Sequence, residues 1–213
     1  MITKINITIS DFLEDVASPS PAPGGGSVAA LSGAKGASLL LMVINLTVKR
    51  KKYSIHHNIL YISLDKIRQM KSELSNNVQK DTEAFFAVRE AMSLPGVTMD
   101  DKVEKTRTVE NTLKAATMVP LEVMTLCCQC LAEAEIMIGR INLNVVSDLG
   151  VAAVCLNAGL RGAFLNVIVN LGGIRDMDFV EKHKKYAEEI LAKGENLYKR
   201  VFSYSVTEVG SKL

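Results

Sequence analysis

The sequence contains no tryptophan, and only 5% of its 213 residues are aromatic. Proteins that bind single-stranded nucleic acids stack the bases on aromatic side chains, so this composition argues against that class. An excess of charge is also missing, because 25 lysines and arginines are balanced by 23 aspartates and glutamates and the net charge is only +2. We therefore expect no nucleic-acid partner, and an anionic ligand would have to bind at a local basic patch.

Cysteines are few: the chain has four, and three of them lie in the apolar stretch Cys127–Cys130. This clustering is not typical of the disulfide framework of a secreted protein, and no second cysteine pair or histidine cluster completes a metal site. We therefore predict buried free thiols, no bound metal and a cytoplasmic location. The N-terminal segment 1–16 also lacks the basic region and long apolar run of a signal peptide.

Two apolar segments, 27–46 and 145–171, are long enough to be compared with membrane spans. Lys35 lies within the first segment, and Asp148 and Arg161 lie within the second. Because a charge near the middle of a bilayer is costly, we predict that both segments are buried helices of a protein with no membrane partner.

Apolar residues recur at helical spacing along almost the whole chain, and no stretch alternates with a period of two for long enough to predict a sheet. The predicted fold class is therefore all-α, a multihelical bundle of long helices in a single domain that spans residues 1–213. The expected helices cover approximately residues 8–17, 27–53, 54–94, 98–140 with a kink or division at Pro120, 144–171 and 176–203.

The fifth of these helices, 144–171, is apolar nearly all round, which predicts a central position in the fold. Such helices are hard to cover completely within 213 residues. We therefore expect a partner subunit to complete the burial, and a homodimer is the simplest case.

The most informative local pattern is a proline-rich approach followed by three glycines and a serine, residues 19–27. The prolines stiffen the chain, the glycines allow the backbone to come close to another group, and a helix begins at once. The free N–H groups and the positive end of the helix dipole would face whatever lies against this turn. The alternative is a tight turn that merely starts a helix.

The longer string PAPGGGSVAALSGAKGASLLLMVINLTVKRKKY, residues 21–53, resembles the signature of the formiminotetrahydrofolate cyclodeaminase and methenyltetrahydrofolate cyclohydrolase family. In that family a proline-flanked Gly-Gly-Gly-Ser opens a helix of small residues, which ends in Asn-Leu-Thr and a lysine-rich turn before a tyrosine. Arg50 departs from the pattern, since a glycine or small residue is expected there. The matching segments are Gly24–Ser27, Asn45–Thr47 and Lys49–Tyr53, and two further segments with family likeness are Asp81–Phe85 and Asn142–Asp148.

The resemblance implies an all-helical dimer that acts on a tetrahydrofolate without a prosthetic group. The typical reaction, an ammonia-lyase (cyclodeaminase) step of one-carbon metabolism and histidine degradation, converts 5-formiminotetrahydrofolate to 5,10-methenyltetrahydrofolate plus ammonia, and it is our first expectation. Close relatives hydrolyse methenyltetrahydrofolate to 10-formyltetrahydrofolate, so a cyclohydrolase is the alternative. A second alternative, from another class, is a non-catalytic helical folate-binding or scaffold protein.

Cyclodeamination needs one group that takes the N10 proton and one that protonates the departing ammonia, and a positioned carboxylate suits either role. Asp148 is our first catalytic candidate because it lies in an otherwise apolar helix, and Asn144, one turn earlier, would orient the substrate. Asp81, which precedes the apolar patch 84–86, is the second. The alternatives are a structural aspartate near a helix N-terminus for Asp148 and a solvated helix face for Asp81.

The only dense basic run is 49–52, and folates carry one or several glutamate carboxylates. Charge-assisted contacts from this run are our prediction for the tail of the substrate, whether or not it is polyglutamylated. The alternative is a set of exposed charges that favour a helix C-terminus. The complete set of predicted substrate-binding residues is Gly24, Gly25, Gly26, Ser27, Lys35, Asn45, Lys49, Lys51, Lys52 and Asn144.

Overall fold

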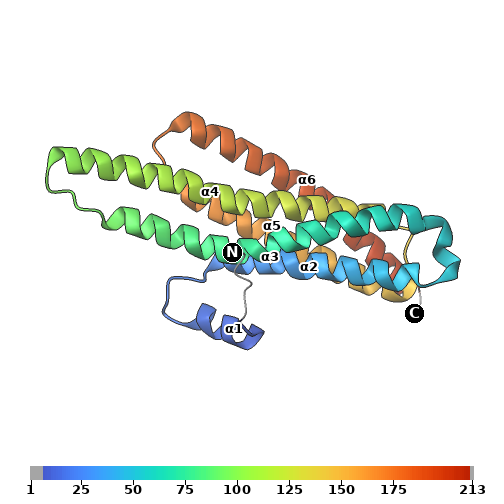
Figure 1. Cartoon of the computed structure of the whole chain (residues 1–213). Coiled ribbons are helices and arrows are strands. Elements are labelled where there is room, and N and C mark those ends of the chain that lie inside the picture. Colours follow the sequence, from blue (N-terminus) through green and yellow to red (C-terminus); the bar gives the residue numbers. More distant parts are fainter. Residues whose placement is uncertain (1–6, 212–213) are drawn as a thin grey trace.

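Helices account for every regular element in residues 7–211, the part of the chain that this computed structural model describes (Figure 1). The prediction of an all-α bundle is confirmed, and no strand occurs within these residues. In chain order the elements are α1 (Ile9–Ala17), α2 (Gly25–Val48), the 3₁₀ turn η1 (Lys51–His56), α3 (His57–Ser93), α4 (Met99–Ile136), the 3₁₀ turn η2 (Leu143–Val145), α5 (Val146–Leu171) and α6 (Met177–Gly210).

Two helices begin with the local signals that their sequences carry. Thr8 accepts a hydrogen bond from the backbone N–H of Asp11, whose carboxylate accepts one from the backbone N–H of Thr8 in return, so α1 starts with a capping box. Thr98 and Asp101 make the same reciprocal pair at the start of α4. Each pair satisfies backbone donors that the first helical turn leaves free.

Several predicted helix limits were wrong. Helix α2 ends at Val48 rather than near residue 53, because the backbone of Arg50 adopts an extended conformation before η1 begins. Helix α4 is not divided at Pro120, which lies buried inside one continuous helix. The packing of α4 against its neighbours thus stabilises the helix by more than the hydrogen bond that is lost because proline has no N–H. Helix α6 continues to Gly210.

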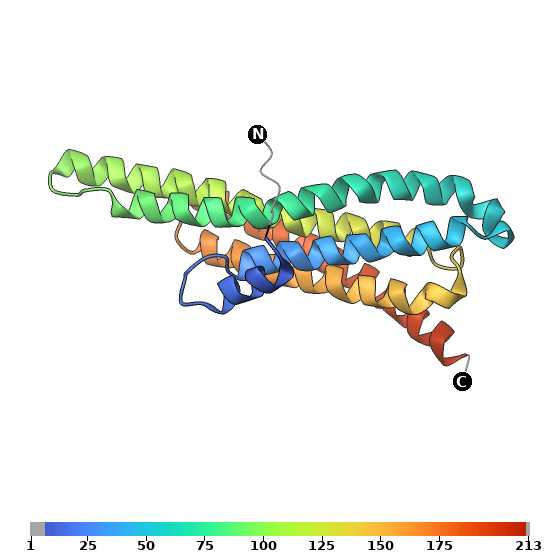
Figure 2. The ribbon, with the colours of Figure 1, turned by 60° about the horizontal axis from the view of Figure 1, so that its bottom comes forward.

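The long helices α2, α3, α4 and α5 pack around a shared apolar core, and α6 lies against α4 and α5 (Figures 1 and 2). Contact between α2 and α5 is close because small residues face each other. A Cβ added to Gly36 would lie 2.8 Å from the carbonyl oxygen of Ala152, and one added to Gly159 would lie 2.8 Å from that of Ala29. The two backbones therefore approach at distances that side chains would prevent.

Helix α5 contacts three other helices, as its composition predicted, but it is not buried all round. Leu149, Leu156 and Leu160 are fully buried, whereas Leu165 and Val169 on the opposite side are 64% and 74% exposed. One chain therefore leaves an apolar strip of α5 open. This observation agrees with the expected need for a partner surface but does not identify one.

Three segments of the described chain are long and apolar enough to cross a membrane, judged by length and composition alone: Gly25–Val48, Met99–Ile136 and Leu143–Leu171. Part of each apolar surface packs inside the bundle. The absence of a membrane partner stays a prediction.

Candidate functional site

The carboxylate of Asp81 on α3 lies against the first turn of α2. The Ser27 hydroxyl donates a hydrogen bond of 2.8 Å to Asp81 Oδ2, and the backbone N–H of Ser27 also bonds to this carboxylate. Ser27 itself is fully buried, and its Oγ lies 3.2 Å from the Oγ1 of Thr82. The glycine turn and Asp81, which were separate candidates in the sequence, therefore form one site.

Gly26 makes this contact possible. A Cβ added to Gly26 would overlap the Asp81 carboxylate, and even the more distant carboxylate oxygen, Oδ2, would lie at only 2.8 Å. The glycine therefore leaves the space into which the carboxylate fits, next to the positive end of the α2 dipole. The glycine turn was expected to let another group come close to its backbone, and within the chain that group is the Asp81 side chain.

Burial raises the pKa of Asp81 above its ordinary value of 3.8, and the two hydrogen bonds from Ser27 oppose part of that effect. Desolvation disfavours the charged form, whereas donors that face the carboxylate favour it. A carboxyl group whose pKa is raised toward the working pH can both accept and release a proton. Asp81 thus has the property that proton transfer requires.

A cavity of about 460 Å³ opens beside Asp81 and the glycine turn. Its volume lies within the range usual for small-molecule sites. Helices α3, α4 and α5 supply most of its walls, and the approach to α2 and its first turn supply much of the rest. The lining is mainly apolar, and its principal members are Ala22, Gly24, Gly25, Gly26, Asp81, Ala84, Phe85, Val88, Arg89, Met92, Leu113, Ala116, Asn166, Val169, Asn170 and Gly173.

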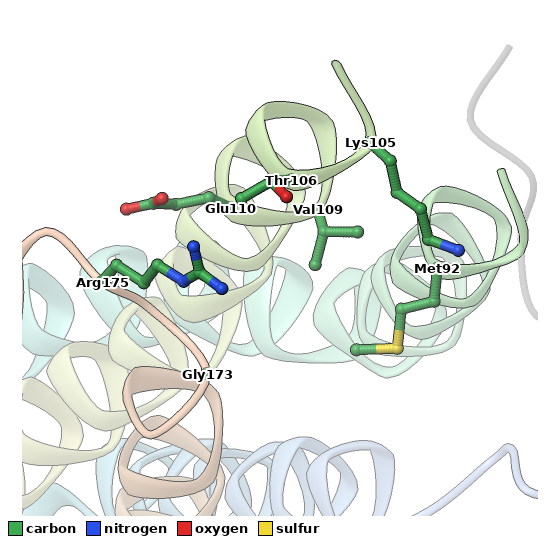
Figure 3. Close-up of a pocket in the computed structure, with 7 residues that line it drawn as sticks. All are labelled: Met92, Lys105, Thr106, Val109, Glu110, Gly173 and Arg175. Carbon is green, nitrogen blue, oxygen red and sulfur yellow. The ribbon is translucent and has the colours of Figure 1, made fainter. Parts of the chain in front are cut away.

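Figure 3 shows a second, smaller cavity of about 290 Å³, which shares lining residues with the first. Met92 and Gly173 line both cavities, so they mark the boundary between the two. Beyond this boundary the wall becomes polar, with Lys105 from α4 and Arg175 from the loop between α5 and α6. The two cavities are thus adjacent, with Asp81 at one end of the pair and Lys105 and Arg175 at the other, and together they are called the groove.

Analysis of the sequence missed three polar residues of the larger cavity, namely Asn166, Asn170 and Arg89, and all the polar residues of the smaller one. The two asparagines are four residues apart on α5, so they lie on the same face of that helix. Their spacing within an apolar helix was the available signal. Arg89 had no signal, because an arginine on a polar helix is ordinary.

Asp148 and Asn144, which were also predicted site residues, lie far from this groove within one subunit. Asp148 is in the first turn of α5, and Asn144 is in η2 just before it. The 18 residues between Asp148 and Asn166 correspond to a rise of about 27 Å. The structure therefore does not place Asp148 with Asp81, and its catalytic role stays a prediction.

The predicted basic run also lies at the other end of α2 from the glycine turn. Lys49, Lys51 and Lys52 follow the C-terminus of α2, and the 24 residues of this helix separate them from Gly24 by about 35 Å. Asn45 is exposed near the same end, and Lys35 is exposed in mid-helix; neither lines either cavity described above. The predicted substrate-binding residues therefore lie in two distant places on the chain.

The cysteines show no sign of a metal or redox centre in residues 7–211. Cys127, Cys128 and Cys130 are buried, Cys155 is half-buried, and all four are free. No three histidine, cysteine or acidic side chains of the described chain gather closely enough to hold a metal ion. The prediction of buried thiols is confirmed for three of the four, and the lack of a metal or prosthetic group stays a prediction.

Comparison with known proteins connects this geometry to a family. A family model described as formiminotransferase-cyclodeaminase matches residues 8–189, a range that includes the glycine turn, Asp81 and both cavities. The chain belongs to the formiminotransferase-cyclodeaminase family. The resemblance inferred from residues 21–53 is thereby confirmed.

Relatives within the formiminotransferase-cyclodeaminase family differ in reaction and in length. The chain is 42% identical over 197 residues to a methenyltetrahydrofolate cyclohydrolase of Methylorubrum extorquens, and the match covers 92% of this chain and 95% of the relative. It is 32% identical to the formimidoyltransferase-cyclodeaminase of Mus musculus, of which it spans only 33%. The crystal structure of a formiminotetrahydrofolate cyclodeaminase from Thermotoga maritima superimposes with a TM-score of 0.86 at 28% identity and covers 96% of this chain and 98% of that one.

Proposed function

We propose that this protein is a methenyltetrahydrofolate cyclohydrolase, which converts 5,10-methenyltetrahydrofolate and water to 10-formyltetrahydrofolate. The observation that carries the proposal is the half-buried Asp81 carboxylate beside a mainly apolar cavity. Methenyltetrahydrofolate is a cation at its reactive carbon, so an anionic side chain beside an apolar wall suits it. The high identity to a cyclohydrolase along nearly the full length of both chains favours hydrolysis over deamination.

Asp81 would act first as a base and then as an acid. Its carboxylate takes one proton from the attacking water as the new C–O bond forms at the carbon between N5 and N10. The bond from this carbon to N5 then breaks, Asp81 returns its proton to N5, and the remaining hydroxyl proton leaves to solvent. The products are 10-formyltetrahydrofolate and one proton, so atoms and charge balance.

Neighbouring groups would keep Asp81 suited to both steps. The Ser27 hydroxyl and backbone N–H hold the carboxylate in place and favour its ionised form, while burial favours the protonated form. Asn166 and Asn170 offer amide donors and acceptors to the ligand from the facing wall. Phe85 and Val88 supply apolar surface for the flat rings.

Formiminotetrahydrofolate cyclodeaminase is the second candidate, and a specific observation favours it. The backbone of the formiminotetrahydrofolate cyclodeaminase from Thermotoga maritima matches this chain along almost its whole length. The same carboxylate could accept the N10 proton as the ring closes and protonate the departing ammonia. Both reactions form or break bonds at the same one-carbon unit.

Two parallel assays test this proposal. Purified protein is given methenyltetrahydrofolate, and loss of its absorbance is compared with the uncatalysed rate; in the second assay 5-formiminotetrahydrofolate is supplied, and methenyl product and ammonia are measured. Faster methenyl loss without deamination is the expected result. Methenyl formation with stoichiometric ammonia would instead show that the protein is a cyclodeaminase. If neither assay shows turnover but the protein still binds a folate, it is a non-catalytic binding protein.

We further propose a homodimer in the cytoplasm. The exposed apolar strip of α5, which includes Val151, Leu165 and Val169, is a surface that a second copy could cover. Sedimentation of the purified protein at several concentrations tests this, and a monomer at all of them would overturn it.

A further inference from the structure

The groove has a direction, which the three helices that form it define. On α3 the lining residues run from Asp81 to Met92, and on α5 they run from Asn166 to Asn170, with Gly173 just beyond the end of that helix. Both series lead from the glycine turn toward the smaller cavity. The 11 residues from Asp81 to Met92 correspond to a rise of about 16 Å, which suits a long ligand that lies along the groove rather than across it.

Unpaired positive charge gathers at the far end of this groove. Arg175 lines the smaller cavity and Arg89 lines the larger one, and neither has an ion pair or hydrogen bond within residues 7–211. Lys105 donates one hydrogen bond of 2.8 Å to the carbonyl oxygen of Leu94, which leaves two donors of its ammonium group free. In Figure 3 the side chains of Lys105 and Arg175 flank the cavity from opposite sides.

The one carboxylate that lines the smaller cavity is partly compensated by its neighbours. Glu110 accepts a hydrogen bond of 2.9 Å from the backbone N–H of Asp176 and lies 3.8 Å from the ammonium of Lys114, which it shares with the Asp176 carboxylate at 2.7 Å. Its carboxylate points away from Lys105 in Figure 3. The charge that faces the cavity is therefore mainly positive, although Lys105, Glu110 and Lys114 are only half-buried.

We propose that Arg175 and Lys105 bind the glutamate carboxylates of the folate, so that the substrate lies along the groove with its one-carbon unit at Asp81. This inference rests on the proposed function and assigns the substrate tail to a different place from the basic run 49–52. A planar guanidinium can bind a carboxylate through two parallel hydrogen bonds, which an ammonium cannot. Each further glutamate of a polyglutamylated folate adds one carboxylate that this end of the groove can attract.

The test compares ligands that differ only in the tail: tetrahydropteroate, which has no glutamate, and tetrahydrofolate with one and with three glutamates. Their dissociation constants are measured by anaerobic calorimetry on the full chain. For the wild-type protein we expect tighter binding as glutamates are added, and the gain should shrink at high salt. Arg175→Gln should weaken triglutamate binding about tenfold, because a hydrogen bond to a charged group is lost, and change tetrahydropteroate binding less than twofold.

Two further variants separate tail binding from structural damage. Arg175→Lys keeps the charge and should recover part of the loss. Arg107→Gln removes an arginine of the same helix as Lys105 that pairs with Glu104 on the surface and lines neither cavity, so it should bind all three ligands as the wild type does.

Other results would overturn the proposal in distinguishable ways. If Arg175→Gln weakens tetrahydropteroate as much as the triglutamate, the residue has only a structural role. If the preference for glutamates survives in Arg175→Gln and in Lys105→Gln but is lost in Lys51→Gln/Lys52→Gln, the tail binds at the other end of α2. In both cases the proposed function stands, whereas failure of all three ligands to bind would reject the proposed function and this inference together.

Discussion

The Asp81 carboxylate occupies the space that a side chain on Gly26 would need. Gly26 and Asp81 are 55 positions apart in the chain, and the missing side chain of the glycine leaves room for the carboxylate. The next residue of the same helix, Ser27, supplies the N–H and O–H donors that bind this carboxylate. This relationship makes Gly26 as informative to test as the carboxylate itself.

Gly26→Ala should therefore displace Asp81 and reduce turnover about 100-fold or more, since a base that is moved from its place loses most of its effect. The extra methyl group should also cost about 1–3 kcal/mol of stability. Gly25→Ala is the matched comparison, because its added Cβ meets only the side-chain nitrogen of Asn166 at an ordinary 3.7 Å. Equal losses of turnover in the two variants would show that the Asp81 contact does not matter.

Asp81→Asn keeps the shape of the side chain but removes its ability to exchange a proton. We expect turnover to fall about 100-fold or more, within the usual contribution of general acid–base catalysis, with little change in KM. The acidic limb of the wild-type rate profile should lie above pH 3.8, because burial raises the pKa of Asp81, and should vanish in the variant. Asp148→Asn, measured alongside, should lose less; a larger loss there would restore Asp148 as the principal catalytic group.

Stability should depend on pH through the same carboxyl group. The folded-state pKa of Asp81 is raised by burial, so between pH 3.8 and the raised value the folded protein binds more protons at this group than the unfolded chain does. The stability of the wild type relative to Asp81→Asn is therefore greatest below pH 3.8 and decreases as the pH rises through the raised pKa. Urea unfolding of both proteins across this range measures the difference.

Asp101 provides a control of opposite sign for that experiment. Hydrogen bonds from the backbone N–H and the hydroxyl of Thr98 lower the pKa of Asp101. Its contribution to stability is therefore present above pH 3.8 and is lost as the pH falls through the lowered value. If the Asp81→Asn and Asp101→Asn differences changed in the same direction with pH, the assignment for Asp81 would be wrong.

The buried thiols should be inert in the folded protein. Burial raises the pKa of the Cys130 thiol to about 12 and that of Cys127 well above its ordinary value, so almost no reactive thiolate exists at neutral pH. We expect a maleimide to leave Cys127 and Cys130 unmodified until the protein unfolds, as mass spectrometry can follow. Rapid labelling of either under native conditions would contradict the observed burial.

Much of the fold could be predicted from the sequence because the relevant signals are local. The spacing of apolar residues at about 3.6 located most helices to within a few residues. The division expected at Pro120 and the end of α2 were misjudged, since the packing of buried neighbours decides whether a helix tolerates a proline or continues past its apolar stretch.

The site was less predictable because it depends on contacts between distant helices. Asp81 and Asp148 are both carboxylates on helices, and sequence alone ranked Asp148 first because its helix is the more apolar. Only the packing of α3 against α2 shows that Asp81 faces the glycine turn. Arg89 and Arg175 gave no local signal, since their importance lies in the groove they share with Asp81.

The long walls of the groove are helices, so insertions or deletions in them cannot change the distance between Asp81 and the basic end gradually. A helix gains or loses length along its axis in steps of about 1.5 Å, and each added or removed residue also turns the following side chains by about 100°. Only changes close to whole turns, about 5.4 Å each, would return Met92 or Leu113 to the groove. Evolution or design of this scaffold toward shorter or longer ligands should therefore proceed by whole helical turns, or by the loop that carries Arg175, rather than by single-residue insertions in α3 or α4.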